Sequence, residues 1–143
     1  MPDISIRILV LAGMLTLLTG LLLGFPLRKA INQDMGEEAV RGWRVAHSSI
    51  LVGGVMLLAI SSALPFMALS LPFKVITVVL LSTSTFAFCY ALIFGAMRLE
   101  RGLVKSTGAL ANSIYYGNVV GALLSVGGLA LLLYGSIAMF VSY

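Results

Sequence analysis

The sequence has few ionisable side chains, one histidine and one cysteine. Charged residues make up 10% of its 143 residues and hydrophobic residues 60%, whereas a soluble domain carries about 25% charged residues. Water is therefore not the main solvent of this chain. The single cysteine, Cys89, excludes an intramolecular disulfide and a cysteine-based metal cluster. Its place within an apolar run predicts a buried, inert thiol.

The arrangements that serve soluble enzymes are also missing. All five acidic residues lie near the N-terminus or in polar loops, so no pair of carboxylates is placed for acid–base catalysis. The sequence contains no glycine-rich phosphate loop and no nucleophile elbow. It also lacks the intramembrane acid of a proton-coupled exporter. Its one histidine cannot form a bis-histidine haem site within one chain.

The sequence does contain long apolar runs, each close to the roughly 20 residues that cross a bilayer. We predict an all-α integral membrane four-helix bundle in a single domain, residues 1–143. The first run has no signal-peptide cleavage motif after it, so we expect a retained helix that ends at Phe25-Pro26. Residues 35–40 are expected to form a short surface helix. The predicted spans are about 5–27, 43–64, 73–97 and 110–141.

The basic residues lie between the apolar runs, which is typical of a membrane protein and not of a nucleic-acid-binding surface. Two loops hold seven of the nine Lys and Arg residues, and the opposite side holds the other two, Arg7 and Lys74. The positive-inside rule therefore predicts that these two loops are cytoplasmic and both termini are outside, in the inner (plasma) membrane of a bacterium. The seven residues are Arg28, Lys29, Arg41, Arg44, Arg98, Arg101 and Lys105.

Small and hydroxyl-bearing residues mark several helix surfaces. Gly20 and Gly24 have the spacing that allows close helix contact. The third run has a hydroxyl-rich centre, residues 82–85, whose side chains can bond to their own helix or to a neighbour. The fourth run carries a stripe of small residues for close packing: Gly117, Gly121, Ser125 and Gly128.

His47 is the residue best placed for chemistry, and it lies near the start of the second apolar run. A neutral imidazole is a good iron ligand, and Gly53 and Gly54 remove bulk that a flat macrocycle would otherwise meet. Arg44, one turn earlier, could pair with a propionate at the membrane edge. The alternative is an interfacial histidine beside a glycine notch for helix packing, and the residues alone favour that alternative.

The segment Gly42-Trp43-x-x-Ala46-His47-Ser48, with Arg44 between Trp43 and Ala46, resembles the second-helix signature of the styrene oxide isomerases. The length, the four apolar runs, the polar first loop and the aromatic third run are similar too. Tyr90, followed about ten residues later by Arg101-Gly102-Leu103, is a further similarity. The resemblance covers most of the chain in architecture, and its specific motif is about seven residues long.

The resemblance implies a homotrimer that holds ferric haem b with His47 as the axial ligand. It implies a Lewis-acid reaction in which iron takes the oxygen of a small apolar epoxide such as styrene oxide. A hydride shift then gives an aldehyde, phenylacetaldehyde, without a redox partner. Tyr90 matches the pocket tyrosine that helps to position the epoxide.

One position departs from the family pattern. The family places an asparagine near the reacting oxygen, six residues after the histidine, and here that position is Gly53. We expect Asn118 or Asn112, from the fourth run, to substitute. Two other functions stay open: a non-catalytic membrane haem protein for sensing or electron transfer, and a cofactor-free assembly or transport subunit. A colourless purified protein would favour the last.

Overall fold

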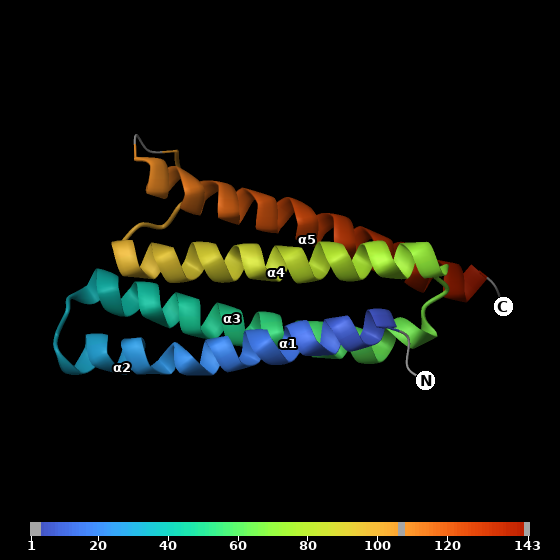
Figure 1. The fold of residues 1–143 in the computed structure, drawn as a ribbon, viewed down its shortest axis with the longest axis horizontal. Helices are drawn as coiled ribbons and strands as arrows, with labels where there is room; N and C mark the ends of the chain where they lie inside the picture. The colour runs from blue at the N-terminus through green and yellow to red at the C-terminus, as the bar shows by residue number, and fades with distance from the viewer. Residues whose placement is uncertain (1–3, 106–107, 142–143) are drawn as a thin grey trace.

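The computed structural model describes residues 4–105 and 108–141, and this part of the chain is helical and without strands. Four of its helical segments are long and apolar enough to cross a membrane, which agrees with the predicted all-α bundle. The first of these segments has two parts (Figure 1). The helices are α1 (Ile4–Leu22), α2 (Gly24–Asn32), α3 (Glu37–Ala63), α4 (Leu71–Arg98) and α5 (Ala109–Val141), with a 3₁₀ turn η1 (Leu64–Phe66) after α3.

The first span is longer than predicted, because Pro26 does not end it. The helix is interrupted at Leu23 and restarts as α2, which continues to Asn32. Pro26 is the third residue of α2, where a helix does not require a backbone N–H. Proline has no backbone N–H, so the carbonyl oxygen of Leu22, four residues earlier, lacks its usual helical hydrogen-bond donor. The interruption of the helix coincides with this missing bond. Proline therefore divides this span without terminating it.

The second span also begins earlier than predicted, at Glu37 and not at Trp43. Asp34 and Gly36 turn the chain with positive φ angles of 48° and 89°. Glu37 and Glu38 then occupy the first turn of α3, where negative charge stabilises a helix. The expected short surface helix is thus the continuous start of α3.

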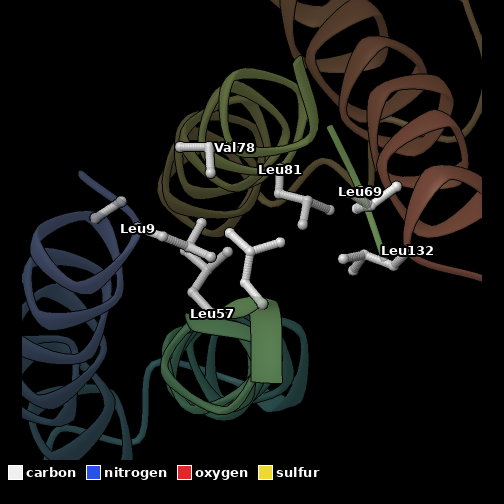
Figure 2. Close-up of a cluster of buried hydrophobic side chains, with 8 residues drawn as sticks. Leu9, Leu57, Leu69, Val78, Leu81 and Leu132 are labelled. Carbon is white, nitrogen blue, oxygen red and sulfur yellow. The ribbon is translucent and has the colours of Figure 1, made fainter. Parts of the chain in front are cut away.

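The helices pack as neighbours in a staggered row (Figure 1). The most extensive packing joins α4 to α5 and α1 to α3, with α4 also contacting α3 and α1. A cluster of buried side chains from α1, α3, α4 and α5 joins them near one end, and Leu9, Leu57, Leu81 and Leu132 converge there in Figure 2. The start of α1 and the end of α5 lie at that same end, and the α2–α3 and α4–α5 connections lie at the other (Figure 1).

The predicted small-residue stripe on α5 is confirmed as a packing surface. A Cβ on Gly121 would lie 3.1 Å from the ring of Phe88, and one on Gly128 would lie 2.6 Å from Leu81. The hydroxyl-rich segment of α4 adds a polar link, because the Ser84 hydroxyl donates to the carbonyl oxygen of Gly121 at 2.7 Å. These contacts hold α4 and α5 together as a pair.

Candidate functional site

His47 lies where α3 crosses the junction of α1 and α2. Its Nδ1 atom is 2.7 Å from the carbonyl oxygen of Gly20. A carbonyl oxygen only accepts, so Nδ1 carries the hydrogen and donates it. Gly20 permits this approach, because a Cβ there would lie 2.9 Å from the backbone nitrogen of Leu51. The bond fixes both the tautomer and the orientation of the ring.

This tautomer leaves Nε2 unprotonated, with its lone pair free. Across residues 4–105 and 108–141, Nε2 makes no hydrogen bond. An imidazole that donates from one nitrogen to a carbonyl and offers the other is the usual form of a metal-ligating histidine. The side chain is half-buried, so a ligand can reach it. His47 can therefore serve as one axial ligand.

A bare metal ion would find too few donors here. The described residues contain no group of three or more His, Cys, Asp or Glu side chains that could hold a metal. Structural and catalytic metal sites need three or four protein ligands. A metal at His47 would have to arrive in a cofactor that supplies its own ligands, as a porphyrin does.

Arg44 and Gly54 differ in how well they suit the expected cofactor site. Arg44 is exposed one turn before His47, where it remains available to an anionic group. Gly54 is buried against α1, and a Cβ there would lie 2.7 Å from Leu17. The space that we expected at Gly54 for a macrocycle is thus filled by α1. This agrees with the alternative interpretation, in which Gly54 is a notch for helix packing. Gly53, by contrast, has open space beside it, with nothing within 4 Å of an added Cβ.

Gly53 faces a cavity of about 310 Å³, which we call the mid-bundle cavity. Asn118 of α5 lines the same cavity, opposite α3. The expectation that Asn118 could supply the amide missing at position 53 is therefore geometrically reasonable. Asn112 lines neither this cavity nor the second one described below. The other lining residues come from α1, α3 and α4: Thr16, Ser49, Ile50, Thr85, Phe88, Cys89 and Leu92.

Asn118 also holds the α4–α5 connection in place. Its Nδ2 donates to the carbonyl oxygen of Gly102 at 3.1 Å and lies 3.4 Å from that of Arg101. Two carbonyl neighbours fix the amide orientation, because only the nitrogen side can donate to them. Asn118 and Leu92 line a second cavity too, of about 370 Å³, between the start of α3 and this connection. The amide thus lies between the two cavities.

Tyr90 lies apart from both cavities, on the outer side of the α4–α5 pair. Its side chain is 38% exposed, and its ring is 4.7 Å from that of Phe94. The hydroxyl is 2.7 Å from the Ser113 hydroxyl of α5. Sequence reasoning missed Ser113, since a serine in an apolar helix gives no distinctive signal. It also missed the Gly20 carbonyl as the partner of His47, although the Gly20/Gly24 spacing had indicated close helix contact there.

The structure therefore brings some candidates together and leaves others apart. Asn118 and Gly53 share the mid-bundle cavity. His47 lines neither of the two cavities described, and neither does Tyr90. Neither described cavity therefore brings the histidine or the tyrosine together with the amide of Asn118.

A family model described as styrene oxide isomerase matches residues 5–137, which is nearly the whole chain. No curated protein matches the sequence.

Proposed function

Because the chain belongs to the styrene oxide isomerase family, we propose that it isomerises an aromatic epoxide to an aldehyde within the membrane. The substrate we propose is styrene oxide, and the product is phenylacetaldehyde. The match spans residues 5–137, so it covers most or all of each of the four spans and every candidate residue named above.

The observation that carries this proposal is the hydrogen bond from His47 Nδ1 to Gly20. It leaves Nε2 free as the atom that would bind the iron of haem b. His47 and the exposed Arg44 thus fit haem b, while Gly54 belongs to the helix contact. When bound, ferric haem b would supply a Lewis acid for epoxide opening.

The reaction needs no further reactant. The benzylic C–O bond breaks, a hydride moves from the terminal carbon to the benzylic carbon, and the terminal C–O becomes a carbonyl. All atoms of the epoxide are retained in the aldehyde. The protein must mainly exclude water, which would trap the cation as a diol.

The mid-bundle cavity suits an uncharged substrate of this kind. Its volume of about 310 Å³ lies within the usual range for small-molecule sites, and Phe88, Leu92 and Ile50 give it apolar walls. Asn118 is the amide of this cavity. The contact from Asn118 Nδ2 to the carbonyl oxygen of Arg101, at 3.4 Å, is the longer and weaker of its two hydrogen bonds. The amide hydrogen in this contact can therefore be redirected to a substrate oxygen at a smaller cost in free energy. Gly53 leaves the room that a side chain would fill.

We propose a homotrimer as the active form. Neither described cavity of one chain joins His47 or Tyr90 to Asn118, so contacts between neighbouring copies can complete a site. Large apolar side chains are exposed on the helices, including Val52 at 58% and Phe86 at 48%. Such surfaces pack against lipid or against another copy.

Absorption spectroscopy combined with an isomerase assay tests the proposed function. The purified protein should show a Soret band that styrene oxide perturbs, and it should form phenylacetaldehyde without added reductant. A haem spectrum without turnover, with strong ligands on both sides of the iron, would favour an electron carrier. A colourless, inactive protein from haem-sufficient cells would favour the cofactor-free subunit.

A further inference from the structure

The second cavity, which we call the end cavity, lies at the end of the bundle that carries the α2–α3 and α4–α5 connections. Its volume is about 370 Å³, and its walls come from the start of α3, the last turns of α4 and the α4–α5 connection. The mid-bundle cavity lies farther along α3, between Ser49 and Gly53. The two cavities therefore follow one another from the polar end of the bundle toward its interior.

Glycine contacts close two sides of the end cavity with backbone. A Cβ on Gly42 of α3 would lie 3.2 Å from Cα of Ala96, so α3 and α4 meet closely there. The α4–α5 connection crosses Gly95, where the backbone N–H of Glu100 donates to the Gly95 carbonyl oxygen at 2.9 Å. The rest of the wall is mainly apolar side chains: Val45, Ala91, Leu92, Leu99 and Leu103.

Four charged side chains also line the end cavity. Glu38 and Arg41 come from the first turns of α3, and Glu100 and Arg101 come from the connection. All four are exposed, so their charged groups can remain in water. Their formal charges cancel, so the cavity offers no net charge to offset the lost hydration of an ion that enters its apolar interior. These walls therefore suit a small uncharged apolar molecule.

Two side chains belong to both cavities. Leu92 of α4 and Asn118 of α5 line the end cavity and the mid-bundle cavity alike. A change in the rotamers of these side chains can therefore open one cavity to the other. The amide of Asn118 can also donate to an oxygen that passes it, in place of its 3.4 Å contact to Arg101.

We propose that the end cavity is the entry chamber for a small uncharged apolar molecule with one oxygen acceptor. The molecule enters at the polar end of the bundle and passes between Leu92 and Asn118 to the mid-bundle cavity. No bond is made or broken during this passage. The identification of the molecule as the epoxide on entry, or the aldehyde on release, rests on the proposed function.

Cys89 provides a test of this route that needs no turnover. It is the only cysteine of the chain, and it lines the mid-bundle cavity but not the end cavity. Its rate of alkylation, measured by mass spectrometry of the full chain in lipid nanodiscs, therefore reports the arrival of a reagent in the mid-bundle cavity. N-phenylmaleimide, which is uncharged, should label Cys89 faster than the anionic N-(4-carboxyphenyl)maleimide. Equal rates would contradict the proposed class of ligand.

A ring placed in the wall of the end cavity should slow this labelling. Val45→Phe should reduce the rate of N-phenylmaleimide about tenfold, because the new ring must leave its preferred rotamer before the reagent can pass. Val55→Phe is the matched control, since Val55 lies on the same helix, is 57% exposed and lines neither cavity. An unchanged rate in Val45→Phe, or an equal reduction in Val55→Phe, would overturn the route.

A shorter side chain between the cavities should have the opposite effect. Asn118→Ala should raise the labelling rate, because it removes part of the wall that the two cavities share. A rate that does not rise would place the passage elsewhere and contradict the proposal. The labelling requires neither haem nor an epoxide. A protein with this route but without isomerase activity would refute the proposed function alone, whereas an active isomerase whose labelling is insensitive to Val45→Phe would refute the route alone.

Discussion

Gly13 and Gly54 lie against each other where α1 crosses α3. A Cβ on Gly13 would be 3.3 Å from the carbonyl oxygen of Gly54, and a Cβ on Gly54 would be 3.1 Å from that of Gly13. Neither helix could approach so closely if either residue had a side chain. This contact fixes the distance between the helices that carry Gly20 and His47, so it also supports the His47 hydrogen bond.

Leucine at position 54 should separate these helices. Gly54→Leu would place a Cβ 2.7 Å from a Leu17 side-chain carbon and 2.8 Å from its backbone nitrogen, and backbone cannot move aside cheaply. We expect a destabilisation at or above the upper end of the roughly 1–3 kcal/mol typical of overpacking. Thermal unfolding in detergent would measure it.

The neighbouring glycine is the matched control. An added Cβ at Gly53 meets no atom within 4 Å, so Gly53→Leu should fold normally and extend into the mid-bundle cavity. If this cavity holds the substrate, KM should rise while the melting temperature stays near that of the parent. Equal stability of the two variants would contradict the close contact at Gly54.

Haem binding should depend on His47. His47→Ala removes the only histidine of the chain and the free Nε2 atom, so the Soret band should disappear or report weakly held haem. Ser48→Ala is the control, since within residues 4–105 and 108–141 that hydroxyl bonds to carbonyls of its own helix, at Arg44 and Val45. A normal spectrum from the His47 variant would identify another ligand.

Asn118 should affect both the α4–α5 connection and turnover. Asn118→Leu removes the donor to Gly102 and Arg101, a net loss of about 0.5–1.5 kcal/mol for one hydrogen bond. Amide hydrogen exchange in residues 99–105 should become faster, and kcat should fall. Asn112→Leu changes an asparagine that lines neither cavity and should leave kcat unaltered. Unchanged exchange in the Asn118 variant would show that the connection is held by other contacts.

Tyr90 should influence turnover more than haem affinity. Tyr90→Phe keeps the ring beside Phe94 and deletes only the hydroxyl. We expect an intact Soret band and a kcat lowered by about tenfold, less than the 10²–10³ of a typical oxyanion donor, because iron would carry most of the developing charge. Turnover at the parent rate would assign Tyr90 to packing.

The membrane orientation is a prediction that the fold leaves open. The structure places the α2–α3 and α4–α5 connections at one end of the bundle. Most of the basic residues lie in these connections or in the helix ends next to them. The positive-inside rule therefore predicts that a reporter after Tyr143 lies outside. A reporter inserted in residues 28–36 should be cytoplasmic, and the reverse pair of results would overturn the orientation.

The sequence by itself determined the number of spans, and it identified the residue that we propose as the cofactor ligand. Hydropathy and span length are local properties, so four apolar runs identify four membrane-length segments without any knowledge of their partners. His47 could be selected in the same way, because it is the only histidine and lies within a family motif.

Only the tertiary structure decided how these residues act. The ring orientation of His47 depends on a carbonyl 27 residues away, and the hydroxyl of Tyr90 contacts that of a serine 23 residues away. Gly53 and Gly54 are indistinguishable in sequence, yet one faces a cavity and the other faces α1. Pro26 could end a helix or divide it, and the packing of α2 on α3 decided the outcome. Each result depends on contacts between segments distant in the chain, which local sequence patterns do not encode.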